Sequence, residues 1–424
     1  MARENAGLNK GRGCWFLMLA MCLAVLPVEA ARADEVRTLP SATTGGAAAV
    51  ISSGVFTRAT GTDRNVEPLE PLFVRPFGKI EPGRNDGNPV WSPSGMFLAF
   101  ERSIGDKKEI HIALADGTDF QTVYHQLSGD NGEMKFFFPG VVEDVSYNAG
   151  ITWSPREDRF VFMSNGGEGN YDLYLGDLGG KAVARLTDHK EKDGQPHWSP
   201  IDDTVVFVSG RTGKGDLYLM DLRTRALTRL TMAGKSARGD KEYLYPQISP
   251  DGRKIVMIAG SNENHDIVLI ADPVKAGAPQ KQLTVWNADD LRPIWSPDGK
   301  KIAFYSNYNA AGDPRLWSIF VIAADGSDPV EGDGLAANRV AEDVIPDVER
   351  GPAWMPDSAR IVFVKNDRQE YNPLYVVDTR DRTALPLKTE TRMNHDVACS
   401  ADGTIAFRAQ VNQWDQIFVA KLRN

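Results

Sequence analysis

The stretch Trp-Ser-Pro-Asp-Gly-Lys-Lys-Ile-Ala-Phe at residues 295–304 shows the unit from which most of this sequence is built. It consists of an apolar anchor, a Ser-Pro turn and a short apolar strand. The unit returns seven times, with successive anchors 45 to 62 residues apart. The anchors are Trp91, Trp153, Trp198, Ile248, Trp295, Trp354 and Cys399. A repeat of this length, with room for four short strands, is typical of a β-propeller.

The residue types beside each anchor suit the entrance of a strand and a tight turn. Pro stands two residues before the anchor in five of the seven units. Its fixed φ and missing N–H suit the entrance of a strand. In the Ser-Pro-Asp-Gly turns at 249–252 and 296–299, Pro presets φ and Gly accepts a positive φ. We expect the large anchor ring to pack between neighbouring blades.

The two ends of the repeat region predict how the ring closes. The seventh unit ends at its third strand, Gln416 to Leu422, and lacks a fourth. A strand-like run from Leu72 to Phe77 precedes the first unit. We therefore predict an all-β propeller of seven four-stranded blades, whose last blade this N-terminal strand completes. A six-blade ring with one irregular unit is the alternative.

The net charge argues against some partners, and the N-terminal segment indicates export. The 424 residues carry a formal net charge of −9, which argues against nucleic acid or an anionic membrane as partner. Residues 1–33 have the pattern of a signal peptide: basic residues, an apolar run at 14–28, and Ala-Arg-Ala at 31–33. An uncleaved membrane anchor is the alternative. We predict export to the periplasm and no membrane span after cleavage. A flexible lead-in at 34–68 and a monomeric propeller at 69–424 would follow.

The repeat resembles that of TolB-like propellers, in its Trp-Ser-Pro-Asp-Gly run, its Leu-Tyr-Leu strands at 173–175 and 217–219, and its Leu-Thr strand endings. The resemblance covers about 350 residues. It implies a periplasmic binding scaffold. TolB has an α/β domain before its propeller, and here only the lead-in stands in that place. Propellers of this class also occur with serine peptidases and as polysaccharide lyases.

Polar residues recur five positions before the anchors, where the chain enters the innermost strand near the channel mouth. They are Asp86, Asn148, Asp193, Tyr243, Asp290, Glu349 and Asn394. Such a ring could hold a cation such as Ca²⁺, which prefers oxygen ligands, or receive a basic peptide. The alternative is that Asp and Asn only end strands and cap turns. Four arginines lie in the same loops and would partly neutralise the ring: Arg84, Arg292, Arg350 and Arg392.

Two long insertions and the histidines are further candidates. The first insertion, 128–148, carries Phe136, Phe137 and Phe138, which either cover the disc or contact a partner. The second, acidic insertion spans 328–347, and long loops often carry specificity. The histidines, His111, His125, His189, His197, His265 and His395, show no metal-ligand spacing. No cofactor motif appears.

These features favour a non-enzymatic binding protein whose partner is an envelope protein or peptide. A carbohydrate-active lyase or hydrolase with its site at the channel mouth is the alternative.

Overall fold

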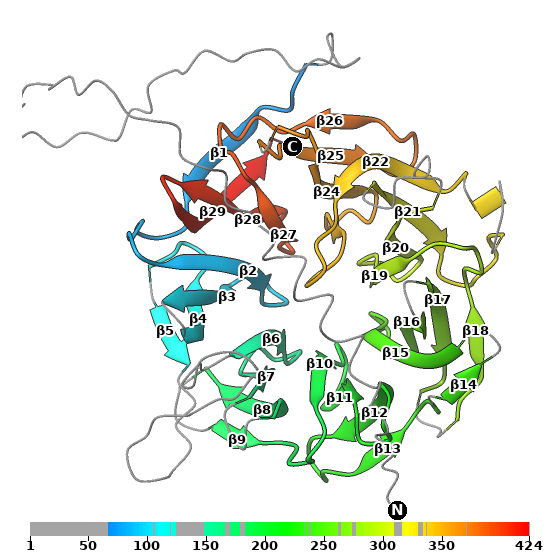
Figure 1. The fold of residues 1–424 in the computed structure, drawn as a ribbon. Coiled ribbons are helices and arrows are strands. Elements are labelled where there is room, and N and C mark those ends of the chain that lie inside the picture. Colours follow the sequence, from blue (N-terminus) through cyan, green and yellow to red (C-terminus); the bar gives the residue numbers. More distant parts are fainter. Residues whose placement is uncertain are drawn as a thin grey trace, which may run out of the picture. The chain divides into compact units, whose positions relative to one another are not determined.

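The computed structural model describes one compact unit within Asp63–Asn424. The residues it describes are 67–104, 107–118, 120–123, 148–165, 170–178, 183–232, 234–236, 239–261, 264–273, 277–308, 316–329, 334–335, 337–369 and 371–423. Its strands form antiparallel sheets arranged around a centre, as the blades of a propeller (Figure 1).

The first three repeats each form one four-stranded sheet in chain order. The first contains β2 (Asn85–Trp91), β3 (Phe97–Ile104), β4 (Lys107–Leu114) and β5 (Phe120–Val123). The second contains β6 (Asn148–Trp153), β7 (Arg159–Ser164), β8 (Asp172–Asp177) and β9 (Val183–Arg185). The third contains β10 (Asp193–Trp198), β11 (Thr204–Ser209), β12 (Asp216–Asp221) and β13 (Leu227–Arg229).

The fourth repeat has an extra short strand, and its sheet contains β14 (Gly234–Ser236), β15 (Gly239–Ile248), β16 (Lys254–Ser261), β17 (Asn264–Ala271) and β18 (Gln280–Gln282). The fifth and sixth repeats share an eight-stranded sheet. It contains β19 (Asp290–Trp295), β20 (Lys301–Ser306), β21 (Trp317–Ala323), β22 (Arg339–Ile345), β23 (Ala353–Trp354), β24 (Arg360–Lys365), β25 (Leu374–Asp378) and β26 (Ala384–Pro386). Six hydrogen-bonded sheets thus hold the seven sequence repeats, and the number of blades as separate units stays a prediction.

The ring closes as the sequence predicts. The seventh repeat supplies β27 (His395–Cys399), β28 (Thr404–Val411) and β29 (Trp414–Leu422). β1 (Pro71–Pro76) pairs antiparallel with β29 and becomes the outermost strand of this sheet. Strands from both ends of the repeat region therefore share one blade, and their pairing protects an edge that would otherwise be open.

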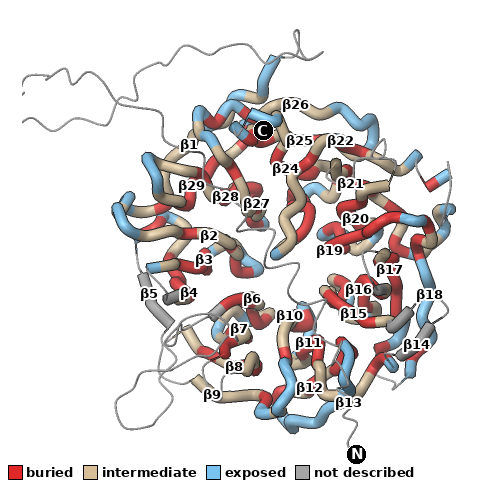
Figure 2. Tube along the Cα trace, in the orientation of Figure 1, coloured by how far each residue is buried: buried red, intermediate tan, exposed pale blue. Residues whose placement is uncertain are grey.

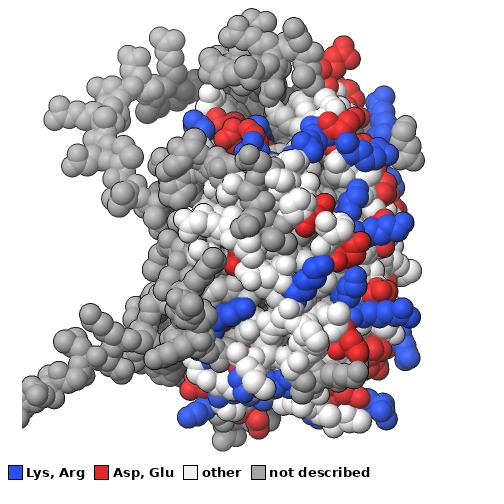
Figure 3. All heavy atoms as spheres, turned by 90° about the vertical axis from the view of Figure 1, so that its right-hand side faces the viewer, with Lys and Arg blue, Asp and Glu red and all other residues white. Residues whose placement is uncertain are grey.

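The core lies between the sheets, because the middle strands are buried on both faces. Buried apolar residues fill the sheets, while exposed residues gather at the rim (Figure 2). Phe100, Phe162, Phe207, Phe304 and Phe407 are at most 1% exposed. The anchors pack between repeats as expected: the Trp153 ring stacks on Phe97 of the preceding repeat at a centroid distance of 6.1 Å. On the outer face shown in Figure 3, basic and acidic side chains are interspersed.

A buried polar network explains the Leu-Thr endings. Asp216 begins β12 and is fully buried. Its carboxylate accepts hydrogen bonds from Thr231 Oγ1 at 2.8 Å and Arg229 Nη2 at 2.7 Å. Thr231 Oγ1 in turn accepts the N–H of Leu217 at 2.9 Å. Residues 172, 185 and 187 make the same arrangement in the second repeat. The Thr thus ties the end of the fourth strand to the start of the third.

Two sequence expectations about loops have different outcomes. The acidic insertion at 328–347 is not one long loop, because Arg339–Ile345 forms β22 and pairs with β21. β22 is the fourth strand of the fifth repeat, and the insertion places it further along the sequence than in the other repeats. The Phe136, Phe137 and Phe138 contact lies outside the described residues, as do the signal peptide and most of the lead-in. No helix in the described ranges is long and apolar enough to cross a membrane.

Candidate functional site

The third residue before every anchor has a positive φ, and we call this the −3 position. Its occupants are Asn88, Gly150, Gln195, Tyr245, Arg292, Gly351 and Asp396, with φ between 49° and 90°. In six repeats the pairing of the innermost strand with its neighbour shifts register across this residue. A positive φ is uncommon outside glycine, so its sevenfold recurrence marks a built feature. Six of the innermost strands therefore carry a bulge, which re-aims the side chains near the axis.

Residues at the −3 position join neighbouring repeats. The backbone N–H of Tyr245 donates to Gln195 Oε1 at 2.7 Å, and that of Asn88 donates to Asp396 Oδ2 at 3.2 Å. The Arg292 guanidinium lies over the Tyr245 ring, 4.1 Å from its centroid. The bulges thus link adjacent repeats around the centre.

The anchor indoles make a second set of links. Trp295 Nε1 donates to the carbonyl of Gln247 at 3.0 Å, and Trp354 Nε1 donates to the carbonyl of Ile294 at 3.3 Å. Both acceptors stand one residue before the anchor of the preceding repeat. In these two repeats the anchor therefore supplies both a buried ring and a hydrogen bond to the preceding repeat.

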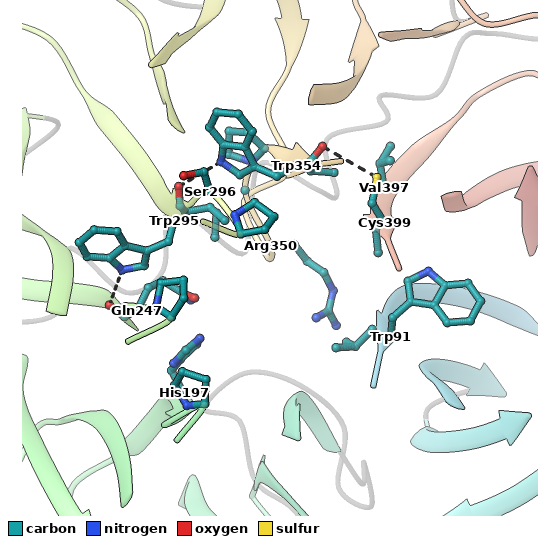
Figure 4. A pocket seen from close by; sticks show the side chains of 18 of the residues that line it. Trp91, His197, Gln247, Trp295, Ser296, Arg350, Trp354, Val397 and Cys399 are labelled. Carbon is teal, nitrogen blue, oxygen red and sulfur yellow. Dashed lines mark hydrogen bonds between the residues drawn. The ribbon is translucent and has the colours of Figure 1, made fainter. Parts of the chain in front are cut away.

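A cavity of about 410 Å³ lies among the innermost strands, at their anchor ends. We call it the axial pocket. Residues from six of the seven repeats line it, and most are Pro, Trp, Ile, Val or Ala. Figure 4 shows Trp91, His197, Gln247, Trp295, Arg350, Trp354, Val397 and Cys399 around the space. Its volume and apolar lining are those of ligand pockets, which commonly measure about 300–1,000 Å³.

The two titratable groups of the pocket other than Arg350 are uncharged near neutral pH. His197 Nδ1 accepts the backbone N–H of Ile248 at 3.2 Å, and burial lowers the pKa of His197 to about 4. This ring is therefore neutral at pH 7. Cys399 is partly buried, its Sγ lies 3.7 Å from Met355 Sδ, and burial raises the pKa of the thiol to about 12. Neither group carries a charge near neutral pH.

The predicted ring of carboxylates and amides does not line this pocket. Asp86 makes two hydrogen bonds of 2.6 Å to Arg102, its partner across β2 and β3. Asp193 is fully buried and accepts from Arg211 Nη2 at 2.9 Å. Each of these carboxylates thus has a cation from its own repeat.

Asp290 and Asn394 are also fully buried. The Asp290 carboxylate accepts from Trp286 Nε1 at 2.9 and 3.0 Å. Burial raises the pKa of Asp290 to about 7, although side-chain hydrogen bonds oppose this rise. Asn394 donates to the carbonyl of Asn372 at 2.9 Å and accepts from Thr391. These contacts are those of residues that stabilise turns and strand ends.

The other three positions behave differently from one another. Tyr243 is buried, and its hydroxyl lies 3.1 Å from Gln280 Oε1. Glu349 is exposed. Asn148 begins β6, and its backbone pairs with Ser164, but its side chain is outside the description. A Ca²⁺ ion at the predicted ring stays a prediction. The described residues contain no group of three or more His, Cys, Asp or Glu that could hold a metal.

The turn before β23 brings a cation to the axis. In this turn the backbone N–H groups of Glu349 and Arg350 both donate to Asp347 Oδ1 at 2.9 Å. Burial, and then the charge of Asp396, raise the pKa of Asp347 to about 7. Burial lowers the pKa of Arg350. Sequence analysis placed Arg350 near the mouth as a neutralising charge, but no residue pattern indicated that it enters a pocket.

This architecture is a β-propeller with an apolar pocket on its axis. Residues 140–278 match the family model described as the TolB beta propeller domain. This part of the chain therefore has repeats of the TolB-like propeller type, as the sequence predicted.

Solved structures with a similar fold include enzymes. An oligogalacturonate lyase in complex with manganese is 13% identical, with a TM-score of 0.59, covering 85% of this chain and 96% of that one. An oligogalacturonate lyase from Vibrio parahaemolyticus is 12% identical, with a TM-score of 0.58 and coverages of 85% and 97%. At these identities the likeness concerns the fold.

TolB from Acinetobacter baumannii is 19% identical, with a TM-score of 0.45. The match covers 72% of this chain and spans 64% of the length of that TolB. No curated protein matches this sequence.

Proposed function

We propose that this chain is an exported, non-enzymatic binding or scaffold protein that holds a segment of an envelope protein in its axial pocket. The observation that carries the proposal is the pocket itself, an apolar cavity of about 410 Å³ lined from six repeats. Apolar cavities with a few polar groups are the usual form of binding sites. The TolB-like fold supports a protein-interaction role.

The rigidity of the pocket wall supports the same function. Hydrogen bonds at the −3 position and from the anchor indoles tie several inner strands to their neighbours. A preorganised wall reduces the entropy lost when a partner binds, so more of the contact energy contributes to affinity. Export to the periplasm is part of the proposal, and it rests on the pattern of residues 1–33 and on the TolB resemblance.

The test is site-specific photocrosslinking in the native envelope. A photoreactive residue replaces Pro297, an exposed residue that lines the pocket, or Leu227, which is 42% exposed on the outermost strand of the third repeat's sheet. We expect mass spectrometry to identify one dominant protein joined to position 297 and not to position 227. Equal capture at both positions, or capture at neither, would contradict the proposal.

The enzyme alternative needs its own assay. Purified full-length chain is incubated with polygalacturonate and envelope glycans, with and without added Mn²⁺ or Ca²⁺, and products are followed by mass spectrometry. The proposal expects no turnover. Turnover lost on His197→Ala, which alters the pocket wall, would replace the scaffold function with catalysis.

A further inference from the structure

Arg350 is the only permanently charged residue among those that line the axial pocket. Its side chain extends from the sixth repeat across the space towards the strand of Trp91 (Figure 4). There its Nη2 donates to the carbonyl of Asn88 at 2.7 Å. Its Nε is buried and has no hydrogen-bond partner. A guanidinium has five N–H donors, so this one contact leaves most of its capacity unused.

The charges of Glu101, Asp347 and Glu349 act on Arg350, but none of these carboxylates forms an ion pair with it. Glu101 pairs with Lys108 at 2.5 Å and accepts from Asn88 Nδ2 at 2.7 Å. Asp396 pairs with Arg408 at 2.8 Å. Within the described residues, Arg350 forms no ion pair.

Arg350 is partly buried, and nearby carboxylates that do not pair with it directly offset its desolvation only in part. Fold stability alone therefore gives no reason to keep an arginine at this point. An arginine placed in an apolar pocket is well suited to hold a planar anion with two oxygens, since its donors match a carboxylate.

We propose that Arg350 binds a carboxylate of the partner's segment, from an acidic side chain or a C-terminus flanked by apolar residues. The inference rests on the proposed function and names the chemistry of the ligand. Pro352, Val397 and Ile294 belong to the apolar lining of the same pocket. A sugar acid has the same carboxylate, but its hydroxyl groups need many polar partners. The anchor indoles are at most 8% exposed and offer little ring face for stacking.

The experiment compares full-length protein with Arg350→Gln, Arg350→Lys and a control, Arg223→Gln, whose arginine side chain is 80% exposed. The probes are a five-residue peptide of leucine and valine around one aspartate and the same peptide with asparagine, both with blocked termini. A form of the asparagine peptide with a free C-terminal carboxylate, and trigalacturonate, complete the set. Binding is measured by ligand-observed NMR and calorimetry.

We expect the aspartate peptide to bind at least tenfold more tightly than the asparagine peptide, because hydrogen bonds to charged groups are the stronger ones. Arg350→Gln should remove this preference, Arg350→Lys should keep part of it, and Arg223→Gln should leave it unchanged. The melting temperature of Arg350→Gln should equal or exceed that of the parent, which separates ligand binding from a structural role.

Several results would overturn the inference. These are equal binding of the two peptides, a preference that survives Arg350→Gln, a large loss of stability in that variant, or tight binding of trigalacturonate without peptide binding. Partner capture at position 297 that Arg350→Gln leaves intact would refute the role of Arg350 but keep the proposed function. Capture at neither position refutes the proposed function itself.

Discussion

Gly351, which lines the axial pocket, is tightly packed against the preceding repeat, and replacing it with alanine tests that packing. Its φ is +90°, which favours glycine. A Cβ atom there would lie 2.6 Å from Ile294 Cγ1 and 2.8 Å from the carbonyl oxygen of Arg292. Both neighbours belong to the preceding repeat, and one is backbone. The substitution therefore forces the innermost strands of the fifth and sixth repeats apart.

The expected loss of stability has two parts. Holding alanine at a positive φ costs about 1–2 kcal/mol, and the reduced freedom of the unfolded chain returns about 0.4–1 kcal/mol. Overpacking against a neighbour that cannot easily move costs a further 1–3 kcal/mol, roughly. We expect Gly351→Ala to lower the free energy of unfolding by about 2–4 kcal/mol.

Gly213→Ala is the control because it has the same backbone strain without the contact. Its φ is +87°, and nothing lies within 4 Å of the added Cβ. Urea unfolding, followed by tryptophan fluorescence, gives the midpoint of each variant. The midpoints can be compared if the dependence of the unfolding free energy on urea concentration is unchanged. Gly213→Ala should cost about 1 kcal/mol or less. Equal losses in the two variants would refute the tight contact at Gly351.

Two further predictions concern the anchors and the buried acids. Trp295→Phe should cost about 1 kcal/mol more than Trp91→Phe, because Trp295 Nε1 bonds to Gln247 whereas Trp91 Nε1 has no partner; equal midpoints in urea would contradict this. The pKa of Asp290 is raised from 3.8 to about 7, so between these values the folded state keeps a proton that the unfolded chain releases. The free energy of unfolding therefore falls as the pH rises from 4 to 7, by an amount on the order of 4 kcal/mol. Asp290→Asn should flatten the dependence of unfolding free energy on pH in this range, leaving the part due to Asp347; an unchanged slope would show that the pKa of Asp290 is not raised.

The sequence was a good guide to the fold because each repeat carries its own local instructions. The Ser-Pro-Asp-Gly turn at 249–252 forms with Gly252 donating to the Ser249 carbonyl at 2.8 Å, as turn chemistry requires. Ring closure could be predicted because the seventh repeat lacked a fourth strand and β1 had no other partner. Both inferences depend only on residue types and on how many strands a sheet needs.

The direction of the inner side chains could not be predicted in the same way. Side chains alternate along a regular strand, but a bulge shifts that alternation by one residue. The −3 residues that form the bulges include Asn88, Tyr245 and Asp396, and share no residue type. Without the bulges, Asp86 and Asp193 could be expected at a channel mouth. In the structure Asp86 is buried against Arg102 of the neighbouring strand, and Asp193 against Arg211 of the loop after the neighbouring strand.

The same bulge explains how a repeated fold can carry an unrepeated site. Because backbone geometry makes the bulge, the side chain at the −3 position is free to differ between repeats. The −3 position beside Arg350 holds Gly351, whereas Tyr245 and Arg292 carry large side chains at the corresponding positions of the two preceding repeats. The Arg350 guanidinium reaches the carbonyl of Asn88, and no other arginine of the described residues lines the axial pocket. Ligand specificity in this propeller would therefore lie in the residues that the repeat does not constrain.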